Sequence, residues 1–383
     1  MVKALVIGAG IAGPTVAVAL RRIGMEVEVF EQFPADADQR GSWLNFQANG
    51  LDALRAIDAG RWVEDLGYPV DTMSFVNGAG KHLGRMPMAF RRTDGLTSRM
   101  MPRAELFVAL ADMARHHGVV VHHGKRLTDA VNTGAGVVAR FDDGSEAAGD
   151  LLIGADGIHS RIRRLIDPAA PDPRYVPVLN IGGYIPDFTV EAPPRDFRMQ
   201  FGTRCFFAWM NTPDGGTLWF ANPPQREEPS RGTLSAITDE QWRRRLHELM
   251  DGDTGPAPAI IDAAPGPLTG WATYDLPVVK HWHDGSRMIV IGDAAHATSP
   301  AAGQGASMSL EDAVILAKCL RDLPDTGRRS RRSSHCVAGG CNGSSRRGTA
   351  PLPRRPPARS SASSATRSSP GSSGRPNATE ARR

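Results

Sequence analysis

The feature that most constrains the fold is a glycine-rich segment near the N-terminus, between an apolar run and an amphipathic one. Residues 3–7 form a short apolar run typical of a buried parallel strand, and residues 15–23 have the apolar spacing of a helix. A second strand is predicted at residues 26–30. Together these elements predict a βαβ unit, and hence an α/β fold with a parallel sheet.

The loop of this unit has the spacing GxGxxG, which is typical of dinucleotide binding. Gly8 permits the tight turn, Gly10 lets the backbone approach a pyrophosphate, and Gly13 lets the helix pack closely on the strand. Glu31 follows the second strand, where an acid accepts hydrogen bonds from a ribose hydroxyl and repels a 2′-phosphate. The pattern predicts FAD or NAD, rather than NADP, bound at Gly8, Gly10, Ile11, Ala12, Gly13 and Glu31.

Two later segments repeat the pattern of an apolar strand that leads into a glycine-rich loop. Residues 150–164 read DLLIGADGIHSRIRR, and residues 287–313 read RMIVIGDAAHATSPAAGQGASMSLEDA. Ligands of an open parallel sheet gather beyond the carboxyl ends of its strands, so three such loops can address one elongated molecule. Either later loop taken alone is equally compatible with an ordinary Asp-Gly turn.

With the three motifs in this order, the chain resembles the single-component FAD-dependent aromatic monooxygenases of the para-hydroxybenzoate hydroxylase type. The motifs lie at residues 8–13, 156–157 and 292–293, and the resemblance covers about residues 1–326. It implies a Rossmann-like FAD-binding domain and a substrate domain built on a β-sheet. The implied boundaries are 1–71, 97–173 and 272–326 for the FAD-binding domain, and 72–96 and 174–271 for the substrate domain.

The resemblance also implies which residues hold the cofactor. Glu31 would bind the FAD ribose and Asp293 the ribityl chain. Asp156 would help to bind both FAD and a transient NADPH or NADH, and Arg163 is a second candidate for the nicotinamide nucleotide. The remaining positions implied for FAD are Arg40, Arg103, Gly292, Pro300, Gly303, Gln304 and Gly305.

The last of these positions have a physical rationale of their own. Gly303 and Gly305 expose backbone N–H groups, and a helix is predicted from about Ala306 to Leu320. The positive end of its dipole would favour negative charge on the pyrimidine edge of the flavin, much as an oxyanion hole does.

The middle of the chain changes character, with strand-like apolar runs joined by the turn TPDGG. Aromatic side chains in these strands are candidates to line a pocket for a flat apolar substrate. Aromatic residues on alternating strands are, however, more often simply core. The candidates are Tyr184, Phe206, Trp209 and Trp219.

Other chemistries find little support. The histidines have no cysteine or carboxylate partner at metal-ligand spacing, so no metal site is predicted. The GxSxG elbow of serine hydrolases and the WxWxIP segment of flavin-dependent halogenases are both missing.

Charge is distributed unevenly along the chain. Lys and Arg number 45 against 41 Asp and Glu, but residues 327–383 contain 13 Arg and a single acid. The remainder therefore carries −8, which argues against a nucleic-acid partner for the folded body. The composition of this tail, which is rich in Arg, Ser and Pro, predicts disorder. It suggests that a frameshift replaced the native C-terminus; the alternative is a genuine basic tail that binds anionic polymers.

Features of the chain also predict its compartment. Its four cysteines form no CxxC pair, which argues against a disulfide scaffold. The uncharged stretch at residues 4–20 is interrupted by three glycines and a proline, so it predicts neither a secretion signal nor a membrane span. We expect a cytoplasmic protein with no membrane partner; the oligomeric state is left open.

The expected activity is hydroxylation of an aromatic, phenolic or polycyclic small molecule. NADPH or NADH would reduce FAD, and dioxygen would react through a flavin hydroperoxide, as the resemblance implies. Two alternatives stay open: an NAD-dependent dehydrogenase that uses the first motif alone, and an inactive or unstable remnant with an altered C-terminus.

Overall fold

The fold is described from a computed structural model of the 383-residue chain. It describes residues 1–35, 43–88, 97–230, 232–299 and 303–322. Arg40, Pro300 and the tail at 327–383 lie outside these residues, so the predictions made for them stay predictions.

A five-stranded parallel sheet with the order β18-β12-β1-β2-β8 forms the first layer. Alternate residues of its central strand point to opposite faces, and both faces are buried. Ala4 and Val6 face one apolar core, whereas Leu5 and Ile7 face another. The strands are β1 (Lys3–Ile7), β2 (Glu26–Glu31), β8 (Val120–His123), β12 (Leu151–Gly154) and β18 (Met288–Val290).

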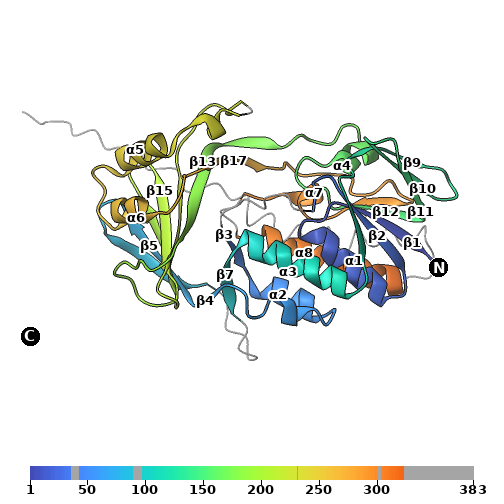
Figure 1. The fold of residues 1–383 in the computed structure, drawn as a ribbon, viewed down its shortest axis with the longest axis horizontal. Helices are drawn as coiled ribbons and strands as arrows, with labels where there is room; N and C mark the ends of the chain where they lie inside the picture. Colours follow the sequence, from blue (N-terminus) through green and yellow to red (C-terminus); the bar gives the residue numbers. More distant parts are fainter. Residues whose placement is uncertain (36–42, 89–96, 231, 300–302, 323–383) are drawn as a thin grey trace, which may run out of the picture. The chain divides into compact units, whose positions relative to one another are not determined.

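Helices cover one face of this sheet, and a small sheet covers the other. α1 (Ala12–Arg22), α3 (Arg103–His116) and α8 (Gly305–Asp322) lie side by side in Figure 1 and contribute to the core that contains Ala4 and Val6. The opposite core includes α4 and an antiparallel three-stranded sheet. These elements are α4 (Arg161–Ile166), β9 (Leu127–Asn132), β10 (Val137–Phe141) and β11 (Glu146–Gly149). The predicted α/β class is confirmed.

A seven-stranded mixed sheet with the order β17-β13-β16-β15-β14-β5-β6 forms a second body of structure. β5 and β6 form an antiparallel hairpin, and β5 pairs in parallel with β14 from the middle of the chain. This pairing joins the segments expected in the substrate domain, although the domain boundaries stay a prediction. The strands are β5 (Thr72–Asn77), β6 (His82–Pro87), β13 (Arg174–Ile185), β14 (Asp196–Phe201), β15 (Phe206–Asn211), β16 (Thr217–Asn222) and β17 (Gly270–Asp275).

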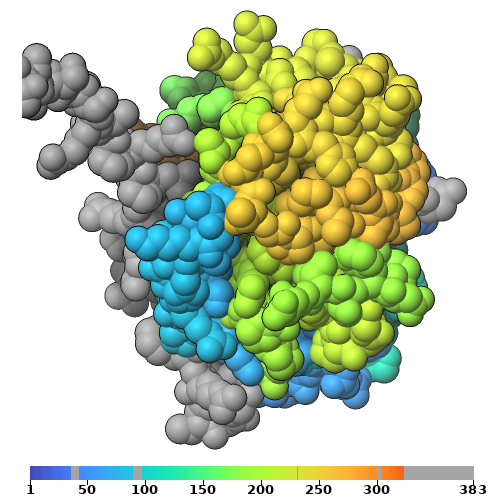
Figure 2. Space-filling model, turned by 90° about the vertical axis from the view of Figure 1, so that its left-hand side faces the viewer, coloured from blue at the N-terminus to red at the C-terminus, as the bar shows by residue number. Residues whose placement is uncertain are grey.

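Two helices cover one face of this sheet. α5 (Asp239–Met250) begins with a capping box, in which Thr238 and Gln241 exchange side-chain and backbone hydrogen bonds. Its buried Trp242 packs with Ile260 of α6 (Ala257–Ala263) on the strands beneath. Figure 2 views this end of the molecule, with the α5 and α6 segments in yellow to orange and β5 and β6 in blue.

The remaining elements link these bodies. A three-stranded sheet has the order β3-β7-β4, from β3 (Trp43–Phe46), β7 (Ser98–Pro102) and β4 (Tyr68–Val70). Two further helices are α2 (Ala48–Arg55) and α7 (Asp293–His296), with 3-10 turns at Gly60–Trp62 and Leu234–Ala236.

Helix α2 begins at Ala48 and ends at Arg55. The following chain turns through Asp58, whose φ of 53° is incompatible with a continuing helix. Among the described helices, none has both the length and the apolar character needed to cross a membrane.

Candidate functional site

The first glycine motif lies in the turn between β1 and α1, and two of its glycines are required by the protein itself. Gly8 has a φ of 102°, and a Cβ added there would lie 2.3 Å from the carbonyl oxygen of Ala155. A Cβ at Gly13 would lie 1.9 Å from the carbonyl oxygen of Gly8. Both separations are shorter than any van der Waals contact, so these positions are glycine for the sake of the fold.

Gly10 is different. Among the described residues, a Cβ there would meet only the Phe107 side chain, at 3.7 Å, so this part of the chain leaves the space open. The space lies next to the first turn of α1, which carries no acidic residue and no side-chain cap and forms the positive end of the helix dipole. An open cradle of this kind fits the pyrophosphate of a dinucleotide.

Glu31 supports this loop from the end of β2. Its carboxylate accepts hydrogen bonds from the backbone N–H of Ala9, at 2.7 Å, and of Phe33, at 3.0 Å. A carboxylate has about four lone-pair sites, so capacity remains for a ribose hydroxyl. The arrangement is compatible with the predicted ribose contact and adds a structural role.

The three motifs meet in space. The Cβ position of Gly8 lies 3.1 Å from the Cα of Asp156, which joins the first motif to the second. The Cβ position of Gly292 lies 3.2 Å from the Cβ of Ala12, which joins the third motif to the start of α1. The expected convergence of the three loops at the carboxyl end of the parallel sheet is confirmed.

Asp156 organises the second loop. Its carboxylate accepts hydrogen bonds from the Ser160 hydroxyl at 2.6 Å and from the backbone N–H groups of Arg161 at 2.7 Å and Ile162 at 3.2 Å. Burial raises the pKa of Asp156, and these hydrogen bonds oppose the rise without cancelling it. Asp156 therefore caps the beginning of α4, and its proposed contact with FAD or a nicotinamide nucleotide stays a prediction.

The placement of Arg163 does not favour the predicted nicotinamide contact. Its side chain has no exposed surface. The guanidinium donates hydrogen bonds to the carbonyl of Ala294 at 2.9 Å and to that of Ile158 at 2.8 Å. Burial lowers the pKa of Arg163, and the charge of Asp156 partly offsets this. The residue ties the second motif to α7 of the third motif.

Replacing Arg163 with methionine is expected to lower the free energy of unfolding by about 3 kcal/mol, because two buried carbonyls lose charged donors. Urea unfolding followed by circular dichroism measures the change. Arg164→Met, in the same helix but exposed, is the matched control and should cost no more than about 0.5 kcal/mol. Equal midpoints for the two variants would contradict the assigned role.

The third motif is held by a residue that the sequence interpretation missed. Asp312 of α8 is fully buried, and its Oδ2 accepts the backbone N–H of Gly292 at 2.8 Å and lies 2.5 Å from Nε2 of His296. Burial lowers the pKa of His296, but the charge and hydrogen bond of Asp312 and the charge of Asp293 outweigh it, so the pKa is raised. The available signal was an acid on the apolar side of a helix directly after the motif.

The other predicted flavin contacts lie around the start of α8. Asp293 is exposed, and its Oδ1 lies 3.8 Å from the Cβ position of Gly305, the first residue of α8. Gly303 has a φ of 59°, and its carbonyl accepts a hydrogen bond from Gln47 at 3.2 Å. Gln304 accepts a hydrogen bond from the Asn49 side chain at 3.3 Å. This arrangement brings Asp293 to the positive end of the α8 dipole.

Arg103 lies near the first motif. It begins α3, and its guanidinium stacks over the Phe107 ring at 5.0 Å, the ring that borders the open space at Gly10. A cation at this border suits an anionic ligand.

The four substrate candidates divide between the two faces of the seven-stranded sheet. Trp209 and Trp219 belong to the core beneath α5 and α6, with 2% and 0% of their surfaces exposed. Both are core side chains, a placement that does not favour the predicted pocket role of either. Phe206 and Tyr184 lie on the opposite face, in the cluster that includes Trp43 of β3.

Trp43 connects this second face to the rest of the site. Its indole N–H donates to the carbonyl of Trp219 at 2.9 Å, and its ring contacts Phe197 and Phe220 edge-on, with centroids 5.3 and 5.2 Å apart. The face that carries Phe206 and Tyr184 is thus the one turned toward the three-stranded sheet.

Comparison with known proteins decides the cofactor. Residues 1–331 match the family described as FAD binding domain. The chain belongs to this family of flavoproteins. It is 30% identical over 331 residues to the FAD-dependent urate hydroxylase of Klebsiella pneumoniae, covering 84% of this chain and 82% of that protein. Identity is 29% over 319 residues with the aurachin C monooxygenase/isomerase of Stigmatella aurantiaca, covering 82% and 80%.

Solved structures agree with this assignment. The flavoprotein superimposes on Klebsiella pneumoniae HpxO in complex with FAD and uric acid with a TM-score of 0.76 at 26% identity, covering 90% of this chain and 87% of that one. The prediction of an FAD-dependent flavoprotein monooxygenase is confirmed by these relatives, and the alternative of an NAD-dependent dehydrogenase is set aside.

Proposed function

We propose that this flavoprotein uses NADPH or NADH and dioxygen to hydroxylate a small, flat aromatic or heterocyclic molecule. The observation that carries the proposal is the convergence of the three motifs, with an open cradle at Gly10. The match to the FAD-binding family and the similarity to proteins named as monooxygenases support it. Relatives named for such substrates support the substrate class: urate, 3-amino-4-hydroxybenzoate and 6-hydroxynicotinate.

The residues of the chain would bind and orient the cofactor. The Gly10 cradle and the N-terminus of α1 would hold the pyrophosphate, and Glu31 a ribose. Asp293 and the backbone around Gly303 would lie along the remaining part of FAD, the ribityl chain and the flavin ring. When bound, FAD supplies electron transfer and the activation of dioxygen. The N-terminus of α8 would stabilise negative charge on the pyrimidine edge of the flavin.

The aromatic face of the seven-stranded sheet would exclude water from a flat substrate. At its end, the hydroxyls of Tyr68 and Tyr184 donate to the same carboxylate oxygen of Asp214, at 2.7 and 3.0 Å. Burial and the hydrogen bond to Asp214 raise the pKa of Tyr68. This phenol therefore stays protonated at neutral pH and acts as a donor, not as a general base.

The test is reductant consumption by the purified, FAD-loaded protein with a panel of urate, 6-hydroxynicotinate and 3-amino-4-hydroxybenzoate. We expect at least one flat ring to accelerate NADPH or NADH oxidation and to gain an oxygen atom from isotopically labelled dioxygen, read by mass spectrometry. Oxidation that yields only peroxide with every compound, or a protein that stays colourless after refolding with FAD, would contradict the proposal.

A further inference from the structure

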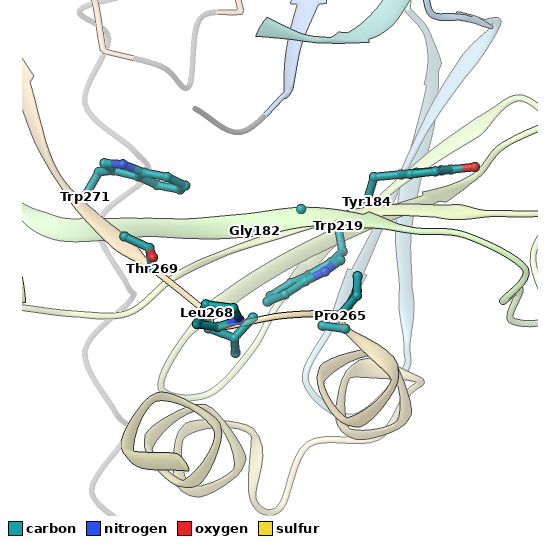
Figure 3. Close-up of a pocket in the computed structure, with 10 residues that line it drawn as sticks. Gly182, Tyr184, Trp219, Pro265, Leu268, Thr269 and Trp271 are labelled. Atoms are coloured by element: carbon teal, nitrogen blue, oxygen red, sulfur yellow. The ribbon is translucent and has the colours of Figure 1, made fainter. Parts of the chain in front are cut away.

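Two amide side chains interrupt the aromatic face of the seven-stranded sheet, the face that carries Phe206 and Tyr184. Alternate residues of a strand point to the same side, so Asn180 shares the side of Tyr184, four residues further along β13. Figure 3 shows Tyr184 and Trp271 on this side of the strand and Trp219 on the other. Asn180 therefore lies on the aromatic face and not in the core beneath α5 and α6.

Asn222 is the second amide, and it lies opposite the first. The β13–β16 ladder pairs Ile181 with Ala221, so its register places the next residues of the two strands, Asn180 and Asn222, across from each other. Side chains in such a cross-strand pair have Cβ atoms about 4.5–5.5 Å apart. Both side chains are half-buried, so the pair forms one polar unit that borders open space.

Aromatic rings flank this amide pair on both sides. Asn222 is paired with Phe206 of β15, and Asn180 with Trp271 of β17. A flat ring that lies against these side chains therefore has apolar contact around two polar groups. Small-ligand sites commonly have this composition, in which a few polar groups fix the orientation of an otherwise apolar contact.

Strand β3 connects this part of the face to the third motif. The ring of Trp43 contacts that of Phe220, two residues before Asn222, with centroids 5.2 Å apart. Asn45 lies on the same side of β3 as Trp43, and its Nδ2 is 3.2 Å from the Cβ position of Gly303. A short series of contacts thus leads from the amide pair to the loop that precedes α8, where the flavin ring is expected.

The two amides present opposite ends to a ligand. Nδ2 of Asn222 donates to the carbonyl of Leu179 at 3.1 Å, so its remaining polar atom is the acceptor Oδ1. Oδ1 of Asn180 is buried, whereas Nδ2 of the same amide, a donor, is not. No described residue forms a hydrogen bond with Oδ1 of Asn222 or with Nδ2 of Asn180. The pair therefore offers one acceptor and one donor side by side.

We propose that Asn180 and Asn222 determine the substrate specificity of the hydroxylase proposed above, on whose function this role rests. They bind the lactam edge of a flat heterocycle, where a ring N–H stands next to a carbonyl. The N–H of the ligand donates to Oδ1 of Asn222, and its carbonyl accepts from Nδ2 of Asn180. A site that hydrogen-bonds both groups rejects an analogue that lacks one, because its own polar group is then left unpaired.

The test compares 1-isoquinolinone, a flat uncharged bicycle with a lactam edge, with its N-methyl derivative, which keeps the carbonyl and lacks the N–H. Calorimetric titration of the FAD-loaded protein measures both affinities, and the flavin absorbance reports whether the compounds bind beside the cofactor. We expect 1-isoquinolinone to bind about tenfold more tightly, as one hydrogen bond allows. Equal affinities, or no binding of either compound, would overturn the proposal.

Two variants separate the roles of the amides. Asn222→Leu should remove the preference for 1-isoquinolinone, because it deletes the acceptor for the N–H. Asn180→Leu should weaken both compounds about tenfold and keep the preference, because both retain the carbonyl. Asn77→Leu is the matched control on β5 of the same sheet: its Oδ1 already accepts the backbone N–H of Lys81 at 2.8 Å, and it should change neither affinity. A preference that survives Asn222→Leu would refute the assigned contact.

These measurements do not depend on turnover, so the two proposals fail separately. If the affinities and variants follow the expected pattern but no compound gains oxygen, the amide pair is supported and the hydroxylation is refuted. If a flat ring is hydroxylated while 1-isoquinolinone and its N-methyl derivative bind equally, the hydroxylation is supported and the role of the amide pair is refuted.

Discussion

Replacing Gly10 with alanine is expected to weaken FAD binding about 100-fold while changing the free energy of unfolding of the FAD-free protein by no more than about 1 kcal/mol. The added methyl group has room among the residues that the structure describes, since the nearest of them is Phe107 at 3.7 Å. It would, however, stand where the pyrophosphate must approach the backbone. Flavin fluorescence titration measures the affinity, and urea unfolding measures the stability.

Gly13→Ala is the informative partner of this variant. Its Cβ would lie 1.9 Å from the carbonyl oxygen of Gly8, so strand and helix must separate. Stability should fall by about 3 kcal/mol, and FAD binding should fall with it. If Gly10→Ala bound FAD as tightly as the parent protein, the pyrophosphate would lie elsewhere. If Gly13→Ala were as stable as the parent, the close packing of α1 would be wrong.

Replacing Asp312 with alanine is expected to lower the free energy of unfolding by about 3–5 kcal/mol and to weaken FAD binding about tenfold. One buried oxygen of Asp312 accepts the N–H of Gly292 and contacts His296, so the change removes the acceptor of two hydrogen bonds in the third motif. Urea unfolding and flavin fluorescence report the two effects. An alanine variant with unchanged stability and affinity would show that α8 does not hold this loop.

The contact between Asp312 and His296 predicts how the free energy of unfolding changes with pH. The pKa of His296 is raised from 6.5 in the folded protein. The stabilisation that protonated His296 gives to the folded state is therefore complete below pH 6.5 and is lost as the pH rises through the raised value. The groups that act on it are Asp293 of α7, and Asp312 and Glu311 of α8. The stability difference between the parent and Asp312→Asn should therefore shrink as the pH rises above 6.5 and through the raised pKa of His296. A difference independent of pH would contradict a charged His296.

The sequence predicted the parts of the site that depend on local pattern. Strand, glycine loop and helix follow one another between Lys3 and Arg22, and the acid at Glu31 ends the next strand, so spacing alone was sufficient. Asp312 and Arg163 were beyond such reasoning. Arg163 contacts Ala294 across 131 residues of chain. Asp312 lies only 20 residues from Gly292, and the pattern marks it as an acid on the apolar side of a helix without showing which backbone N–H group it meets.

The substrate candidates show a different limit. Alternation along β15 placed Phe206 and Trp209 on opposite faces, because their positions differ by three residues. Both faces of the strand are apolar, so the pattern could not indicate which face α5 and α6 would cover. The aromatic residues of β15 indicated apolar surface on the strand. Which rings pack in the core beneath α5 and α6 and which lie on the opposite face depends on segments distant in the chain.

The order of the elements along the chain has a consequence for biosynthesis. The cradle at Gly10 emerges from the ribosome early, but the strand β18 at one sheet edge and the helix α8, which anchors the third loop, emerge more than 270 residues later. Until then, β12 lacks its β18 neighbour at the sheet edge and the third loop lacks its contact with α8. Free flavin nucleotide should then act as a folding ligand, drawing late intermediates toward the native state by mass action, and riboflavin supply should influence how much protein accumulates in a cell.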